Sequence, residues 1–248
     1  MILDIDAGNT RLKYRVIEGS GNIIGSETKE LIYPASMTEL LESLSGEVPK
    51  SELTRVRIAS VRDTAFNNTF FDIVQSQWQI APEFAEVEKN SCGVTNAYSD
   101  IQTMGVDRWL AMIAAFNHVR SVCCVLDFGS AITFDWIDSH GFHQGGYIVP
   151  GISLMQESLA RKTSALDITL EQWEQVGPGK STAETISHGI LAMVTGFVGF
   201  CREQAEKSGS ECHWFLAGGD AELVSHQLDW KHEIRKDLVL EGLDLILP

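Results

Sequence analysis

Short apolar stretches alternate with longer amphipathic ones along this chain, and the same order occurs twice. The short stretches have the length and the composition of buried strands. They fall at 2–6, 13–18, 22–28 and 55–61 in the first half of the chain, and at 121–128, 132–137, 142–149 and 213–217 in the second half. The pattern therefore predicts two sets of strands in one chain.

Helical spacing of apolar residues occupies the intervals between these strands. Trp109, Ile113 and Phe116 lie at positions i, i+4 and i+7, which places them on one face of a helix. The predicted helices cover 37–44, 65–78, 104–119, 151–160 and 181–207. We interpret each half as a β-β-β-α-β-α unit and expect an α/β fold.

The two halves also share a motif at their first strand. DIDAGNTRLKYRVIE opens the first half and LDFGSAITFDWID opens the second. In each, a strand ends in Asp, and one further residue, a Gly and a small polar residue lead into the next strand. Because a whole motif recurs, the architecture is predicted to be duplicated. We expect two similar domains, 1–118 and 119–248, with a cleft between them.

Composition narrows the classes of function. The chain has 34 acidic and 19 basic residues, for a formal net charge of -15. Proteins that bind nucleic acid neutralise phosphates with Lys and Arg, so the charge argues against such a partner. An anionic substrate would need local help from backbone N–H groups, a metal ion or a few placed cations.

The cysteines and the apolar stretches indicate a compartment. The five cysteines form no C-x-x-C pair, which favours free thiols in a reducing cytosol over a disulfide framework. No signal-peptide pattern opens the sequence, and no uninterrupted apolar stretch is long enough to cross a bilayer. We therefore expect a cytoplasmic protein without membrane association.

The two acidic turns have the residue types of a phosphate-binding hairpin. In the first turn, Gly8 lets a ligand approach the backbone, and Asn9 and Thr10 add donors. Asp6 at the strand end can hold a hydrated Mg²⁺. An ordinary hairpin uses the same residue types, but it has no reason to recur with Asp127 and Gly129. The pair is interpreted as a clamp on a polyphosphate, with two carboxylates for cations.

A third motif, Gly105 to Trp109, opens the predicted helix 104–119. Asp107 in a first helical turn is often only a favourable charge near the helix N-terminus, and Arg108 would then be a surface charge. In the alternative, Asp107 accepts a proton from a substrate hydroxyl and Arg108 binds an anionic group. The residues alone leave both readings open.

Two further glycine-rich segments are ambiguous. The segment 177–182 contains GKST, but Glu174 stands where a P-loop requires Gly, so we predict a loop with Ser181 or Thr182 as N-cap. Gly218-Gly219-Asp220 follows a strand, either as a tight turn or as a contact for adenosine. The histidines lack zinc-site spacing.

Taken in order, four motifs resemble those of type III pantothenate kinases, a family within the actin-like ATPases and sugar kinases. They are DxGNTxxK at 6–13, GxDRW at 105–109, DxGxAxT at 127–133 and GGYIxPG at 145–151. The resemblance spans nearly the whole chain, including AGGDA and DLVLEGL near the C-terminus. It implies a duplicated actin-like (ribonuclease H-like) fold and ATP-dependent phosphorylation of the primary hydroxyl of pantothenate, the first step toward coenzyme A.

The resemblance also implies roles for individual residues. Asp107 corresponds to the general base, Asp127 to a site for a monovalent cation, K⁺ or NH₄⁺, and ATP would be bound with Mg²⁺. The substrate contacts would be Tyr98, Gly105, Val106, Asp107, Arg108 and Thr182. The ATP contacts would be Asp6, Ala7, Gly8, Asn9, Thr10, Arg11, Leu12, Lys13 and Ser130. The family is typically a homodimer with its substrate site near the subunit interface.

Two other functions fit the same fold. One is an ATP-binding regulatory accessory protein without kinase activity, although a pure binder has no need of a base at Asp107. The other is a kinase for another small hydroxylated metabolite, because the identity of the substrate rests on the resemblance.

Overall fold

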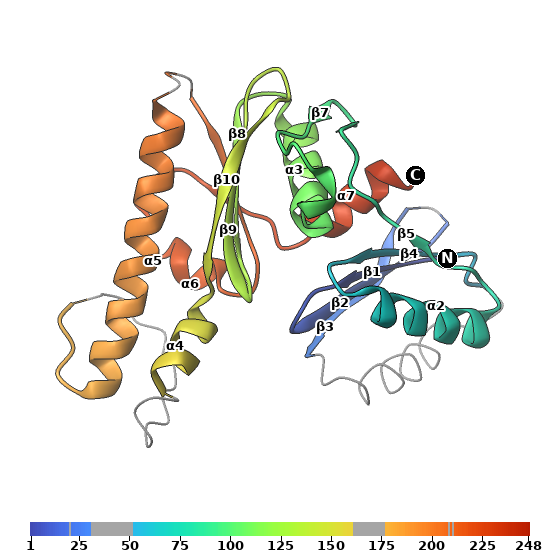
Figure 1. The fold of residues 1–248 in the computed structure, drawn as a ribbon, viewed down its shortest axis with the longest axis horizontal. Helices are drawn as coiled ribbons and strands as arrows, with labels where there is room; N and C mark the ends of the chain where they lie inside the picture. The colour runs from blue at the N-terminus through green and yellow to red at the C-terminus, as the bar shows by residue number, and fades with distance from the viewer. Residues whose placement is uncertain (20, 31–51, 161–176, 208, 210) are drawn as a thin grey trace. The chain divides into compact units, whose positions relative to one another are not determined.

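The computed structural model describes residues 1–19, 21–30, 52–160, 177–207, 209 and 211–248, which divide into two compact units (Figure 1). The first unit comprises Met1–Cys92, Tyr98–Ala114 and Leu238–Pro248, and the second comprises Gly93–Ala97 and Ala115–Asp237. The C-terminal segment thus returns to the first unit. The predicted boundary near residue 119 stays a prediction.

A mixed five-stranded sheet forms the core of the first unit. Its order is β3-β2-β1-β4-β5, with β1 antiparallel to β2 and parallel to β4. The elements are β1 (Ile2–Ala7), β2 (Arg11–Ile17), β3 (Ile23–Glu30), β4 (Arg55–Ser60), α2 (Thr64–Trp78) and β5 (Glu83–Phe84). The central strand β1 ends at the first acidic turn.

The period-two alternation of β1 gives the sheet two different faces. Leu3 and Ile5 pack in the core cluster that α2 completes, so Asp4 and Asp6 lie on the opposite face. Helix α2 begins after Asp63, whose carboxylate accepts a hydrogen bond from the backbone N–H of Phe66 at 2.8 Å. Its buried residues are Phe66, Phe70, Val74 and Trp78, which recur every four residues.

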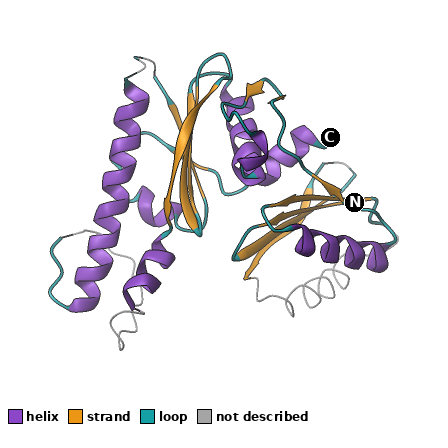
Figure 2. Ribbon diagram, in the orientation of Figure 1, coloured by secondary structure: helices purple, strands orange, loops and turns teal. Residues whose placement is uncertain are grey.

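The second unit repeats this plan. Its sheet has the order β10-β9-β8-β11-β12, with β8 antiparallel to β9 and parallel to β11. Figure 2 shows α5 and α4 lying along one face of this sheet. The elements are β8 (Cys123–Phe128), β9 (Ala131–Ile137), β10 (His143–Pro150), α4 (Ile152–Ala160), α5 (Thr182–Glu206), β11 (His213–Ala217), α6 (Ala221–Ser225) and β12 (Glu233–Ile234). The central strand β8 occupies the place of β1, so the predicted duplication is confirmed in the strand order.

The remaining described elements lie outside the two five-stranded sheets. They are β6 (Asn90–Ser91), β7 (Val94–Thr95), the short 3-10 helix Ile101–Thr103, α3 (Val106–Val119) and α7 (Leu238–Ile246). Helix α3 begins two residues later than predicted, because Met104 has extended backbone after the 3-10 turn. The other predicted strands and helices differ from the structure by a few residues at their ends, and the predicted helix 37–44 lies outside the described residues.

Candidate functional site

The first acidic turn is a tight hairpin between β1 and β2. The N–H of Gly8 donates to the carbonyl of Arg11 at 3.0 Å, and Arg62 Nη1 donates to the carbonyl of Asn9 at 2.8 Å. Asn9 and Thr10 are exposed at the tip, and Asp6 is partly exposed where β1 ends. A bond from Arg62 to the backbone therefore fixes the turn, while its polar tip stays open to a ligand.

Four residues in and beside this turn differ in what they offer a ligand. Ala7 and Leu12 are fully buried in the core of the first unit, so any contact they make with ATP uses their backbone. Arg11 is exposed and Lys13 is partly exposed, opposite Asp6 in the register. Of these four residues, Arg11 and Lys13 have charged side chains within reach of solvent.

The second acidic turn, between β8 and β9, has the same construction. The N–H of Gly129 donates to the carbonyl of Ala131 at 3.1 Å. A Cβ at Gly129 would lie 3.3 Å from Asp127 Oδ1, so the missing side chain leaves room for that carboxylate. Ser130 is exposed at the tip. Both units thus end their central strand in an acidic turn, as the sequence predicts.

Two glycines from the other motifs pack against this second turn. A Cβ at Gly151 would lie 2.3 Å from the carbonyl oxygen of Gly129, and one at Gly218 would lie 2.4 Å from that of Phe128. Gly218 also has a φ of +87°, which L side chains rarely adopt. These close contacts explain why both positions require glycine. The predicted adenosine contact at 218–220 stays a prediction.

The third motif folds its carboxylate back over the first turn of α3. Asp107 Oδ1 accepts a hydrogen bond from the N–H of Arg108 at 2.7 Å. A Cβ at Gly105 would lie 2.5 Å from this oxygen, so Asp107 can keep this conformation only next to glycine. The side chain of Asp107 is partly exposed and that of Val106 is buried. The spacing Gly-x-Asp therefore determines where the candidate base points.

Arg108 and Tyr98, which the sequence predicts as substrate contacts, lie side by side. Arg108 Nη1 donates to Tyr98 Oη at 2.9 Å, and the guanidinium carbon lies 5.7 Å from the centre of the phenol ring. Arg108 is only 7% exposed, so its guanidinium is held in place rather than mobile in solvent. A fixed guanidinium is well suited to bind a carboxylate.

The structure identifies which residue caps α5. Ser181 is the N-cap, and its hydroxyl accepts a hydrogen bond from the N–H of Glu184 at 3.1 Å. Thr182 is the first helical residue and is exposed. The loop and the N-cap predicted for this GKST segment are thus confirmed, because residues 177–180 form neither helix nor strand and Ser181 caps the helix.

The sequence that builds this site is similar to those of known proteins along the whole chain. A model of the family described as type III pantothenate kinase matches residues 2–204. The chain is also 36% identical over 256 residues to a type III pantothenate kinase of Pseudomonas aeruginosa (strain LESB58), covering 100% of this chain and 99% of that relative. The chain belongs to the type III pantothenate kinase family. This membership confirms the resemblance carried by the four motifs.

Several solved structures have the same fold as this chain. A conserved putative Baf family transcriptional activator from Campylobacter jejuni has a TM-score of 0.64 at 18% identity, covering 99% of this chain and 96% of that one. A putative 2-dehydro-3-deoxygalactonokinase from Sinorhizobium meliloti has a TM-score of 0.58 at 10% identity, covering 98% and 97%. Together with the two five-stranded sheets, these likenesses confirm the predicted duplicated actin-like fold.

The donor set of this pantothenate kinase family member suits cations that share ligands with a nucleotide. In the part of the chain that the structure describes, no three His, Cys, Asp or Glu side chains gather into a metal cluster. Mg²⁺ is commonly held by one or two carboxylates, water and substrate phosphates. Asp6 and Asp127, each partly exposed at the end of a central strand, fit that mode rather than a metal site built of protein ligands alone.

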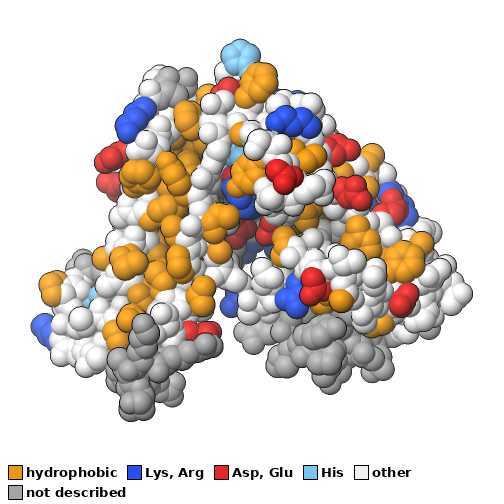
Figure 3. Space-filling model, in the orientation of Figure 1, with side chains coloured by type: hydrophobic (Ala, Val, Ile, Leu, Met, Phe, Trp, Pro, Cys, Tyr) orange, Lys and Arg blue, Asp and Glu red, His pale blue; other side chains and the backbone are white. Residues whose placement is uncertain are grey.

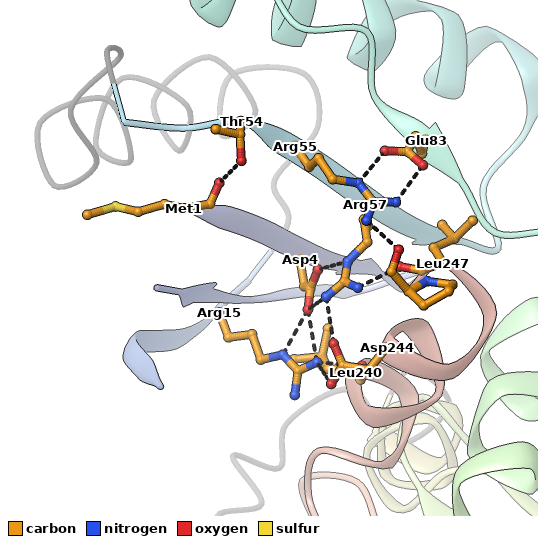
Figure 4. A network of polar contacts seen from close by, with 11 residues as sticks. Met1, Asp4, Arg15, Thr54, Arg55, Arg57, Glu83, Leu240, Asp244 and Leu247 are labelled. Carbon is orange, nitrogen blue, oxygen red and sulfur yellow. Dashed lines mark hydrogen bonds and ion pairs between the residues drawn. The ribbon is translucent and has the colours of Figure 1, made fainter. Parts of the chain in front are cut away.

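Sequence reasoning missed a group of buried charges on the first sheet (Figure 4). Asp4 lies opposite Arg15 and Arg57 in the register of β1 with β2 and β4, and it accepts hydrogen bonds of 2.7–2.9 Å from both. Burial lowers the pKa of the Arg57 guanidinium, but Asp4 and Asp244 outweigh this and raise it above its ordinary value. The alternation of Asp4 and Asp6 in β1 was the available signal, because it puts both carboxylates on one face.

Proposed function

We propose that this chain transfers the γ-phosphoryl group of ATP to the primary hydroxyl of pantothenate, the first step of coenzyme A biosynthesis. Family membership supports the reaction, and one observation supports the site. The partly exposed carboxylate of Asp107 and the buried guanidinium of Arg108 are adjacent in the first turn of α3, with Tyr98 fixing the guanidinium.

The roles follow from the chemistry of the acceptor. Pantothenate carries a carboxylate and a primary alcohol. Arg108 binds the carboxylate, with Tyr98, Gly105, Val106 and Thr182 as further contacts. Asp107 orients the hydroxyl and takes its proton. Because phosphoryl transfer has a loose transition state, such positioning supplies much of the rate.

The ATP contacts are proposed at the two acidic turns. The hairpin 6–13 and Ser130 bind phosphate oxygens through backbone N–H groups and hydroxyls. Asp6 holds Mg²⁺ and Asp127 holds K⁺ or NH₄⁺. These cations supply positive charge beside the phosphates, which a chain with a formal net charge of -15 lacks.

We further propose that the protein is a cytoplasmic homodimer. Large apolar side chains gather over α5 and β10 (Figure 3). This apolar surface consists of the exposed Tyr147, Ile148, Leu154, Met193 and Phe200. Helix α5 is also long and apolar enough to span a membrane by length and composition alone, with a third of that stretch buried. We propose that a second copy of the chain packs against this apolar surface.

Pantothenate-dependent release of ADP tests the reaction and the base together. We expect Asp107→Asn to lower kcat by roughly 10²-fold or more, while Asp72→Asn, an exposed Asp on α2, keeps the activity of the wild type. Near-normal turnover in a folded Asp107→Asn variant would refute the role of Asp107. ATP consumption that ignores pantothenate but responds to a sugar or an N-acetylhexosamine would refute the substrate.

A further inference from the structure

Helix α7 approaches α3 more closely than a side chain would allow. A Cβ at Gly242 would lie 2.4 Å from the carbonyl oxygen of Leu110 and 2.7 Å from its carbonyl carbon. Both atoms belong to the backbone, so they cannot turn away as a side chain would. Gly242 does not have a positive φ, and its requirement for glycine is therefore one of space. The contact fixes the distance between the two helices.

The contact falls on the part of α3 that carries the candidate site. Leu110 is fully buried and lies three residues after Asp107 and two after Arg108. A hydrogen-bonded helix moves nearly as a rigid rod over one turn. A shift of the backbone at Leu110 therefore also shifts the carboxylate of Asp107 and the guanidinium of Arg108.

Helix α7 is itself fixed to the first sheet by ion pairs. Asp244 Oδ2 lies 2.6 Å from Arg15 Nη2, and Asp244 Oδ1 lies 2.6 Å from Arg57 Nη2. Both arginines also bind Asp4, which is fully buried. The group thus has two positive and two negative charges, and Asp244 is its only member on α7 (Figure 4).

Backbone carbonyls near the end of the chain reinforce this attachment. Arg15 Nη2 donates to the carbonyl of Leu240 at 2.7 Å, Arg57 Nη1 to that of Leu247 at 2.6 Å, and Arg55 Nη1 to that of Pro248 at 2.6 Å. Apolar burial alone is non-directional and would let the helix slide. These bonds hold α7 at one position along the sheet.

We propose that α7 acts as a brace: it is bonded to the first sheet and packs against α3, so it fixes where α3 lies relative to that sheet. Gly242 and Asp244 are then positioning residues for phosphoryl transfer. The inference rests on the proposed roles of Asp107 and Arg108. The inference adds Gly242 and Asp244, which lie more than 130 positions after Asp107 and Arg108 in the sequence. Neither residue contacts substrate or nucleotide in the proposed function.

Gly242→Ala tests the contact. Alanine favours a helix more than glycine does, so any loss reports the clash with Leu110. We expect kcat/KM for pantothenate to fall at least about 10-fold, which corresponds to a shift of Asp107 and Arg108, with the KM for ATP changed less than about 2-fold. Gly199→Ala, in α5 with no atom within 4 Å of the added Cβ, is the matched control. An unchanged kcat/KM in folded Gly242→Ala would overturn the proposal.

Asp244→Asn provides a second measurement that does not depend on activity. We expect amide hydrogen exchange to accelerate in residues 106–112 of α3 and to stay unchanged in α2, whose contacts lie on the other face of the sheet. Faster exchange throughout the first unit would mean that Asp244 only stabilises the unit as a whole. Unchanged exchange would mean that Asp244 does not hold α3 in place. Either result would overturn the brace.

Assaying Asp107→Asn alongside separates this inference from the proposed function. If Asp107→Asn keeps its turnover while Gly242→Ala loses kcat/KM, the role of the base fails and the brace stands. If Asp107→Asn is inactive and Gly242→Ala matches the wild type, the base stands and the brace fails.

Discussion

Arg108 is a buried cation whose orientation depends on a neighbouring phenol. Its Nη1 donates to Tyr98 Oη, and its guanidinium lies beside the phenol ring. An arginine side chain has several rotatable bonds, so a guanidinium that is not fixed loses entropy when it binds a carboxylate. In the proposed reaction, Tyr98 would contribute to substrate binding by holding Arg108 before the substrate arrives.

Tyr98→Phe should raise the KM for pantothenate. The substitution keeps the ring and removes the hydrogen bond, which is worth about 1.5 kcal/mol when one partner is charged, so we expect an increase of about 10-fold. The KM for ATP should change little. Steady-state kinetics with each substrate varied in turn would show this, with Asp72→Asn on the exposed face of α2 as the control. A KM for pantothenate equal to that of the wild type would mean that Arg108 does not depend on Tyr98.

Single residues also show where prediction from the sequence stops. The resemblance implied that Tyr98 and Arg108 each contact the substrate, but their hydrogen bond to each other was not predicted, since ten positions and a 3-10 turn separate them. The burial of Asp4 was missed because its partners Arg15 and Arg57, and Asp244 which both arginines also bind, come from three distant segments. Local patterns report the face on which a side chain lies, but they do not report what covers that face.

Among secondary-structure elements, the edge strand β5 is joined to β4 by an ion pair that titrates. Arg55 Nε and Nη2 donate to the two carboxylate oxygens of Glu83, each at 2.8 Å. The hydrogen bond from Arg55 lowers the pKa of Glu83 below its ordinary value of 4.5. The pair therefore stabilises the fold above that pH, and its contribution is lost as the pH falls through the lowered pKa of Glu83.

Glu83→Gln should lower the free energy of unfolding at pH 7 by about 0.5–1 kcal/mol, as expected for a partly exposed pair. The difference from the wild type should shrink below about pH 4.5 and vanish once Glu83 is protonated in both the folded and the unfolded chain. Urea unfolding at pH 7 and at pH 3 would measure it, with the exposed Glu203→Gln on α5 as the control. A difference that persists at pH 3 would show that the loss is not one of charge.

Elements were predicted better where their signal is local. The hairpins around Gly8 and Gly129 follow from turn residues that recur at the same spacing, and the cap at Ser181 follows from its place before an amphipathic run. The start of α3 was predicted two residues early, because Met104 is buried in extended conformation and apolar periodicity does not report backbone angles. The length of a pattern is therefore a weaker guide than the residues at its ends.

For the whole chain, the sequence predicted the duplicated strand order. It did not predict which of the two units the C-terminal segment packs in. Both sheets follow one order because both halves carry the same succession of strands. Helix α7 nonetheless belongs to the first unit, since Arg15 and Arg57 bind its Asp244 and further bonds hold the carbonyls of the helix and of the two residues after it. A sequence-based division places a boundary at one point, whereas the chain returns to its first unit after completing the second.

The exposed apolar surface of the second unit has a consequence for the assembly of the whole protein. Met193 is 63% exposed and Phe200 is 45% exposed, seven residues apart on one face of α5. In a dimer with two-fold symmetry the same surface meets itself, so new charges on it would be buried in both copies at once. We expect Met193→Glu combined with Phe200→Glu to convert a dimer into a monomer in sedimentation velocity at about 10 μM chain, a concentration at which interfaces of standard size stay associated.

Ile23→Glu is the matched control for this double variant, because Ile23 is 54% exposed in the first unit and lies outside the apolar surface. It should leave the dimer intact. Helix α5 is also apolar enough to span a bilayer. Flotation of the wild type with phosphatidylcholine vesicles therefore tests whether lipid or a second copy of the chain packs against this surface. A wild type that sediments as a monomer and floats with the vesicles would mean that lipid rather than a second copy covers this surface. A dimer that stays out of the lipid fraction, and that dissociates only in the double variant, would place the interface on α5 and β10.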